Sequence, residues 1–187
     1  MEMNIPEVVA LNIVQQDPAT LRDLLAAGKK IPAEATTFLM QDHAEVKGMF
    51  LQHQAERDNE IKSVLAQKIC TALTVHAIVE EEIFYPAVGR SLEDDEMVTE
   101  AIEEHGEMKG EIAKIVDGMA AEKSTIRIVK KLMRIVEHHV EEEETEIFPD
   151  MRQTGMDLYE LGSQMAARRV EALLDLTRQA RTAAGQA

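Results

Sequence analysis

The sequence contains few of the residues that build disulfide frameworks, β-sheets and tight turns. Its 187 residues include one cysteine, no tryptophan, 3% aromatic residues, 9 glycines and 5 prolines. The single Cys70 excludes an intramolecular disulfide, and it excludes a cage of several cysteines around zinc or an iron–sulfur cluster. Because the remaining composition is rich in alanine, leucine, glutamate, methionine and lysine, it favours helices over sheets.

Lysine and arginine are also scarce relative to the acidic residues. The chain has 20 Lys and Arg residues against 35 Asp and Glu residues, which gives a net charge of −15. Proteins that bind nucleic acids or anionic membranes cluster Lys and Arg on their surfaces, so we expect neither kind of partner. The first residues lack the basic region and apolar run of a signal peptide, and no segment approaches the ~20 apolar residues of a membrane span. We therefore expect a cytoplasmic protein.

Apolar residues recur at helical spacing along five segments of the chain. They predict helices over residues 33–57, 58–86, 91–118 and 157–180, and a fourth helix that starts near 124 and ends around 149–155. Pro86 and Gly89 are expected to end the second helix. Short connections between the first four helices are typical of an antiparallel up-down four-helix bundle. We predict an all-α fold with three parts: an N-terminal helical appendage (1–35), the four-helix bundle (36–155) and a C-terminal fifth helix with its tail (156–187).

Two pairs of segments repeat within the predicted bundle. Asp42-His-Ala-Glu-Val-Lys-Gly48 resembles Glu104-His-Gly-Glu-Met-Lys-Gly110, and His76-x-x-x-Glu80 resembles His139-x-x-x-Glu143. The spacing between the two segments is nearly equal in each half. Two helical hairpins related by a pseudo-twofold axis would bring one histidine from each helix to the inward faces.

This repeated pattern predicts a metal site. A histidine and a glutamate four residues apart project from one face of a helix and can reach a common cation. A lone histidine on an apolar stripe is more often an ordinary core residue, but burying four imidazoles and two carboxylates without a cation would be costly. The predicted metal ligands are therefore His43, His76, Glu80, His105, His139 and Glu143.

Some neighbouring residues compete for these roles. His139 shares the apolar stripe of its helix, whereas His138 does not, and the other glutamates around each pair are expected to be mostly solvated. Glu144, five residues after His139, remains an alternative to Glu143. Lys47 and Lys109, each four residues after a predicted ligand, either pair outward with glutamates or act beside the metal. His53 lies about 15 Å along the helix from His43, too far to share the site.

The quoted motifs resemble those of the hemerythrin-like, cation-binding HHE family of non-haem iron proteins. The resemblance covers about residues 36–175 and implies an oxo- or hydroxo-bridged di-iron centre. It implies that the four histidines are terminal nitrogen ligands and that Glu80 and Glu143 bridge the two ions. Oxygen-carrying hemerythrins have a second histidine where this sequence has Lys109, and their last carboxylate corresponds to Glu144. The resemblance therefore points to responses to iron, peroxide or nitric oxide more than to reversible oxygen carriage.

The functional expectation is a di-iron protein that binds, senses or scavenges O2, peroxide or nitric oxide. Mixed imidazole and carboxylate ligands suit iron, and they also suit zinc and manganese. Two alternatives stay open, a metal storage or buffering module and a structural metal site in a partner-binding bundle. A nucleophilic hydrolase is not expected, because no Ser or Cys has a suitable spacing to a His.

Overall fold

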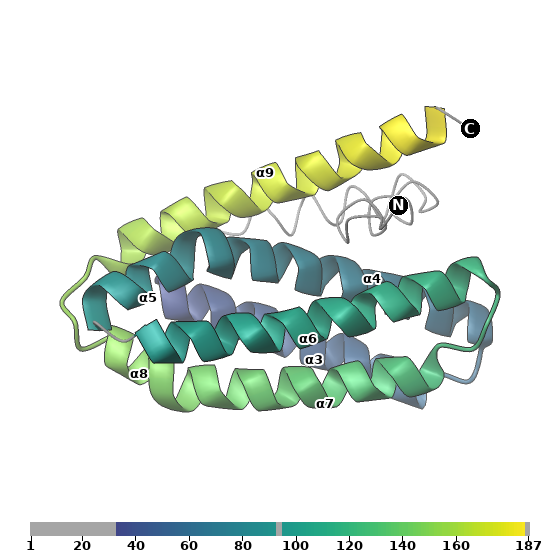
Figure 1. Cartoon of the computed structure of the whole chain (residues 1–187), viewed down its shortest axis with the longest axis horizontal. Coiled ribbons are helices and arrows are strands. Elements are labelled where there is room, and N and C mark those ends of the chain that lie inside the picture. The colour runs from purple at the N-terminus through teal and green to yellow at the C-terminus, as the bar shows by residue number, and fades with distance from the viewer. Residues whose placement is uncertain (1–32, 93–94, 186–187) are drawn as a thin grey trace.

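The computed structural model describes residues 33–92 and 95–185, and this part of the chain is helical without a β-strand. Four long helices lie side by side: α3 (Ala35–Ala55), α4 (Asn59–Val79), α6 (Asp95–Ala120) and α7 (Ile126–Glu142) (Figure 1). The last helix, α9 (Leu158–Gly185), lies over this layer of helices. The prediction of an all-α helical bundle is confirmed, whereas the division into three parts stays a prediction, and most of the expected appendage (residues 1–32) lies outside the described residues.

Side-chain caps fix where several helices begin. The carboxylate of Asp58 accepts hydrogen bonds from the backbone N–H groups of Glu60 and Ile61, at 2.8 and 3.2 Å, at the start of α4. Asp157 does the same for Tyr159 and Glu160 at the start of α9. Such caps satisfy N–H groups that have no partner inside the helix.

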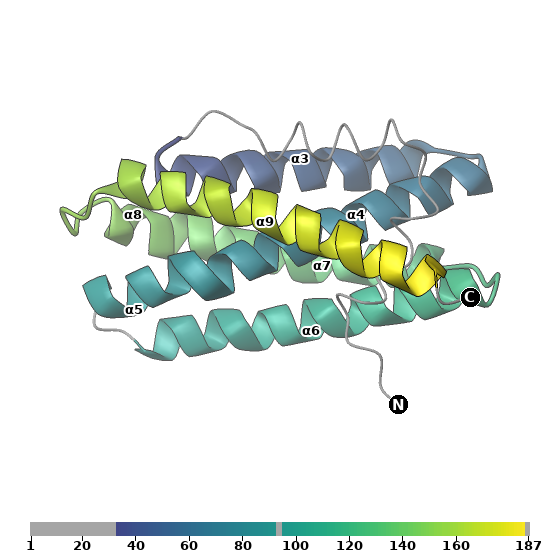
Figure 2. The same ribbon diagram turned by 90° about the horizontal axis from the view of Figure 1, so that it is seen from above.

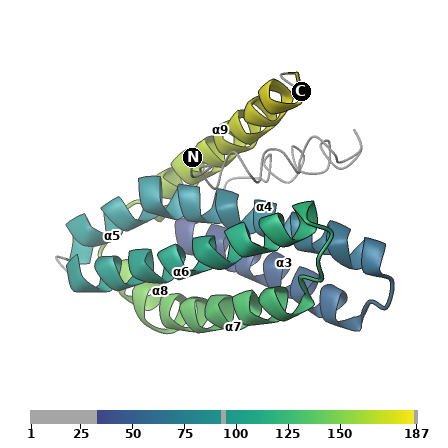
Figure 3. The same cartoon turned by 45° about the vertical axis from the view of Figure 1, so that its right-hand side comes forward.

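Packing is not the same on all sides of the bundle. α3 packs on α4, α6 packs on α7, and α9 packs on α3 and α4. Figures 1 and 3 show the C-terminal part of α9 rising away from the other helices, and Figure 2 shows α9 crossing over them when seen from above. Near the start of α9, a Cβ atom on Gly162 would lie 1.9 Å from the carbonyl oxygen of Ala33. Glycine is therefore required where α9 meets the chain that leads into α3.

The buried apolar residues form two clusters, and the histidines lie between them. On α3, His43 separates Leu39 of one cluster from Val46 of the other. On α6, His105 separates Ala101 and Met108 in the same way. The equivalent histidines of α4 and α7 also lie between members of the two clusters. A polar layer therefore crosses the middle of an otherwise apolar core.

The helix that begins with α4 continues past its expected end, whereas the one that begins with α7 ends within the expected range. α4 runs directly into a π-helical turn, η1 (Glu80–Phe84), and then into α5 (Tyr85–Leu92). α7 continues in the same way through η2 (Glu143–Ile147) into α8 (Phe148–Met151). The expectation that Pro86 ends the second helix is therefore wrong. The wide turn ends immediately before α5, so Pro86 lies in the first turn of the new helical segment, where a missing N–H is tolerated.

None of the helices within residues 33–92 and 95–185 has the length and apolar character needed to span a bilayer.

Candidate metal centre

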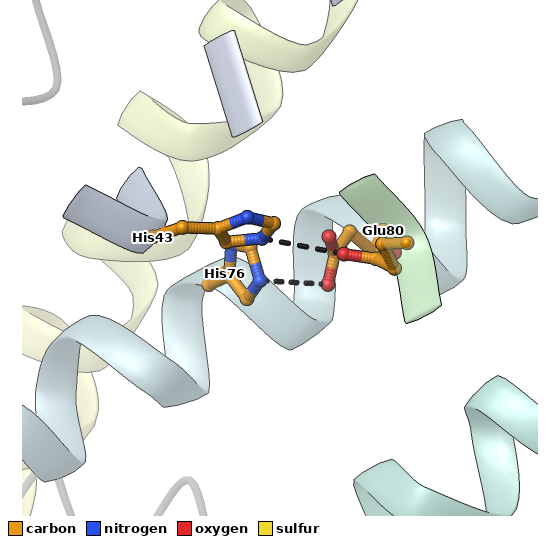
Figure 4. A group of neighbouring side chains, drawn as sticks. His43, His76 and Glu80 are labelled. Carbon is orange, nitrogen blue, oxygen red and sulfur yellow. Dashed lines mark ion pairs between the residues drawn. The ribbon is translucent and has the colours of Figure 1, made fainter. Parts of the chain in front are cut away.

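All six predicted ligands meet in the polar layer of the core. Each of the six residues lies on a different element, and none is more than 6% exposed. The six elements are α3, α4, η1, α6, α7 and η2. The six side chains form two groups whose potential ligand atoms lie within 4.8 Å of one another: His43, His76, Glu80 and Glu143 in one group, and Glu80, His105 and His139 in the other. Figure 4 shows the rings of His43 and His76 directed toward the side of the site where Glu80 lies. The second group shares Glu80 with the first.

Each of the two central glutamates contacts histidines from both halves of the repeat. Glu80 Oε2 lies 3.0 Å from Nε2 of His76 and 3.3 Å from Nε2 of His105. Glu143 Oε2 lies 3.2 Å from Nε2 of His43 and 3.6 Å from Nε2 of His139. The carboxylates therefore occupy the centre of the layer and the imidazoles surround them.

Several of these buried atoms have no hydrogen-bond partner among the described residues. They are Nε2 of His43, Nδ1 of His76, both carboxylate oxygens of Glu80 and Oε2 of Glu143. Leaving a buried polar atom unsatisfied costs about 1–3 kcal/mol, and more for a charged group. Imidazole nitrogens and carboxylate oxygens that converge without hydrogen-bond partners are suitable ligand atoms for divalent cations. A bound cation would interact with these atoms together.

The protein environment distributes protons unequally among the four residues of the first group. Burial raises the pKa of Glu80, and the neighbouring Glu143 carboxylate raises it further. Burial alone would raise the pKa of Glu143 as well, but His139 and His43 lower it below its usual value. Burial opposes the charge on His43, yet Glu143, Glu80 and Glu144 raise its pKa to about 9. Burial lowers the pKa of His76 to about 4.

A second set of carboxylates holds the outer nitrogens of three histidines. Nδ1 of His43 donates to Glu144 at 2.9 Å, and Nδ1 of His105 donates to Glu81 at 2.8 Å. Nδ1 of His139 donates to Glu104, also at 2.8 Å. These bonds direct each Nε2 atom inward, the orientation that metal-ligating histidines require.

The fourth histidine has a different outer neighbour. Nδ1 of His76 lies 3.8 Å from Asp42 Oδ2, too far for a hydrogen bond. Asp42 is itself buried and accepts a hydrogen bond from the guanidinium of Arg169 on α9. Helix α9 therefore reaches the surroundings of the metal centre through one buried ion pair.

The match with a known family agrees with this geometry. The sequence profile of the hemerythrin HHE cation-binding domain matches residues 34–151, which contain all six converging side chains. The chain belongs to this family. Comparisons with curated proteins and with solved structures gave no match. Membership of the HHE family implies a cation-binding domain, and the buried histidine and glutamate groups fit a metal site.

Sequence reasoning missed part of the HHE centre. Glu81 was expected to be mostly solvated, but it is bound to His105, because the π-helical turn lets consecutive glutamates face inward. Glu143 and Glu144 are not alternatives in space: Glu143 lies in the centre, whereas Glu144 binds the outer side of His43. The role of Glu104 was also missed, since its partner His139 lies on another helix.

Tyr85 is the other residue that sequence reasoning did not find. Its hydroxyl donates to Oε1 of Glu143 at 3.0 Å and lies 3.2 Å from Nε2 of His105. Burial raises the pKa of this phenol well above its usual value, and the carboxylates of Glu143 and Glu80 raise it further. The repeat could have pointed to Tyr85, because an aromatic residue follows the histidine by nine positions in both halves. These aromatic residues are Tyr85 after His76 and Phe148 after His139.

The remaining candidates separate into outer and remote positions. Nζ of Lys109 binds both oxygens of Glu81, at 2.5 and 2.7 Å, so this lysine pairs with a glutamate that holds a predicted ligand. His138 is on the surface within 3.4 Å of Glu142. His53 is buried near the loops at the far end of the bundle, in agreement with its exclusion from the site.

Proposed function

We propose that this HHE domain holds two iron ions among His43, His76, Glu80, His105, His139 and Glu143, and that it binds, senses or scavenges O2, peroxide or nitric oxide. The observation that carries the proposal is the pair of donor groups that share Glu80 and contain unsatisfied buried atoms. Four histidines would act as terminal ligands, and the two central glutamates would bridge. Zinc and manganese are the other metals that this donor set accepts.

When bound, iron at such a site would supply redox chemistry and a coordination position open to a small ligand. The residues of the chain supply the surroundings. Glu81, Glu104 and Glu144 would fix the orientation of three imidazoles through their Nδ1 hydrogen bonds. The hydroxyl of Tyr85 would orient Glu143, and the two apolar clusters on either side would keep bulk water out.

We prefer this function to metal storage or buffering because of the burial of the centre. A buffering site exchanges its metal ion readily, which requires that the side chains around the ion are accessible to solvent. Here all four histidines and both central glutamates are between 0% and 6% exposed. The unsatisfied donor atoms also argue for a resident metal.

Three further parts of the proposal concern the fold and the setting. We infer that α3, α4, α6 and α7 alternate in direction as an antiparallel up-down bundle, which the short links between α3 and α4 and between α6 and α7 support. We also infer a cytoplasmic location and a small diatomic or peroxide ligand as the partner. The acidic net charge of −15 disfavours nucleic acid and anionic membrane surfaces as partners.

Metal analysis and an absorption spectrum of the purified protein test the proposal. We expect two iron ions per chain and near-ultraviolet charge-transfer bands. A His76→Ala/His139→Ala double variant removes one ligand from each half and should lose both the bands and the iron. Circular dichroism should show that the variant keeps its helices. A colourless wild-type protein that retains zinc would instead support a structural metal site, and one that takes up no iron on reconstitution would support a partner-binding bundle.

A further inference from the structure

An apolar pocket opens between α3 and α7 beside the candidate metal centre. Its volume is about 310 Å3, and the side chain of His43 forms part of its wall. Most of the remaining wall is apolar, and it includes Met40, Ala44, Leu51, Met133, Val136 and Val140. α3 and α7 contact each other less extensively than either contacts its partner in sequence, which leaves room for this pocket.

A small void of about 10 Å3 adjoins the pocket. It is lined by His43, His76 and His139, three of the four predicted histidine ligands. The pocket and the void share His43, Val136 and Val140 as wall residues. Val136 and Val140 therefore lie in the wall that the surface pocket shares with a void lined by three predicted ligands.

The other half of the repeat carries an ion pair at the equivalent position. There, Lys109 and Glu81 form an ion pair of 2.5 Å beside His105. Their counterparts in the repeat are Lys47 and Glu144, and both of these line the pocket. The pseudo-twofold relation is therefore broken at the point where a small molecule could approach a histidine ligand from the surface.

We propose that the α3–α7 pocket receives and holds a small neutral ligand such as nitric oxide or O2 and that Val136 and Val140 separate it from the metal centre. Apolar cavities accommodate apolar gases because few polar groups hold water in them. The net charge of −15 disfavours anions by comparison. This inference rests on the proposed function and adds the side from which the ligand approaches.

A matched pair of tryptophan variants tests the pocket. Met40 at its mouth is 39% exposed, and its repeat counterpart on α6, Ile102, is 45% exposed, so both positions tolerate a larger side chain. Met40→Trp should partly fill the pocket, whereas Ile102→Trp adds the same indole on the opposite side. The measurement is the rate at which the spectrum of the reduced, iron-loaded full chain changes on mixing with nitric oxide.

We expect Met40→Trp to slow this change roughly tenfold, which corresponds to about 1.4 kcal/mol in the barrier. Ile102→Trp should leave the rate close to that of the wild type. Met133→Ala widens the pocket and should raise the rate. A faster reaction would show that the rate depends on how easily nitric oxide enters the pocket, because a variant with a damaged fold would not react faster. Iron content and the resting spectrum should be the same in all four proteins.

Two different failures can be told apart. If the wild-type protein holds iron but does not respond to nitric oxide, the proposed function is wrong for this ligand, and the role of the pocket fails with it. If the wild type responds and both pocket variants react at the wild-type rate, the function stands and the pocket is not the route. An equal slowing by Ile102→Trp would also overturn the assignment of the route to the α3–α7 side.

Discussion

The two halves of the repeat, α3–α4 with η1 and α5 and α6–α7 with η2 and α8, carry the same ligands but differ around them. α9 covers the first half and donates from Arg169 to Asp42. In the second half the residue equivalent to Asp42 is Glu104, which binds His139 directly. Tyr85 of the first half reaches the centre with a hydroxyl, whereas its counterpart Phe148 stacks on His43 with ring centroids 5.8 Å apart.

The repeat therefore conserves the positions of the ligands while their environments have diverged. His43 and His105 keep equivalent outer glutamates but face different aromatic rings. His76 and His139 differ in their outer carboxylates, because only His139 is hydrogen-bonded to its own. A centre built by two similar helical hairpins can therefore have two donor groups with different surroundings. This asymmetry can be tested by changes that act on one half only.

The largest expected effect comes from the ion pair that joins α9 to the first half. Arg169→Ala would remove the cation from a buried pair, and breaking such a pair should lower the free energy of unfolding by about 3 kcal/mol. Arg168→Ala is the matched control, because Arg168 pairs with Glu82, which is half exposed. That change should cost less than about 1 kcal/mol. Denaturant unfolding of both variants, loaded with the same metal, measures the difference, and equal losses would contradict the distinction.

A smaller effect is expected from Tyr85 and Phe148, the aromatic residues that occupy equivalent positions in the two halves. Tyr85→Phe removes a buried hydrogen bond to Glu143 and should lower the free energy of unfolding by about 2 kcal/mol. Metal content should be unchanged, since the predicted ligands remain. The swapped variant Tyr85→Phe/Phe148→Tyr should not recover this stability, because Phe148 is stacked at 11° on His43 while Tyr85 is tilted at 43° to His105. Full recovery in denaturant unfolding would show that the two positions are interchangeable.

The third comparison concerns the protons on His43 and His76 within the first half. With a pKa of about 9 in the metal-free protein, His43 is protonated at pH 7 and must lose its proton to bind metal, whereas His76, with a pKa of about 4, is already neutral. Metal affinity should therefore rise between pH 7 and 9, by up to about tenfold per pH unit for each displaced proton. Competition with a chelator of known pH dependence measures the slope.

The metal-free protein should respond to pH in the opposite sense through His43. Its folded-state pKa lies above the ordinary value of 6.5, so its contribution to stability is fully present below pH 6.5 and is lost as the pH rises through about 9. A metal affinity that is flat from pH 7 to 9 would contradict this assignment of the proton. So would a metal-free protein whose stability does not decline in that range.

The convergence of the four histidines was predictable from the sequence because it follows from a period within each helix and from the repeat. His139 could be chosen over His138 by its apolar stripe, and the structure has them 1% and 66% exposed at their side chains. The outer partners were not predictable in this way. Which helix Glu104 or Glu81 faces depends on how neighbouring helices are rotated, and no spacing within one helix encodes this rotation.

Tyr85 was missed for a different physical reason. Nine residues of regular α-helix turn a side chain by about 900°, which places it on the face opposite His76. The π-helical turn adds about one residue to the helix and changes that angle by about 100°, toward the ligand face. Because the sequence did not reveal η1, it also placed the end of the helix at Pro86.

The two π-helical turns have a consequence for how each helix presents its surface. Both begin at a central glutamate, Glu80 in η1 and Glu143 in η2. Before the turn, the helical spacing places the histidine on the inward face. After the turn, that spacing is shifted by one residue, and Tyr85 or Phe148 lies on the inward face. Each continuous helix therefore has two inward-facing stripes that are offset by one residue at the π-helical turn. The residues that face the core before the turn and those that face it after the turn belong to different stripes.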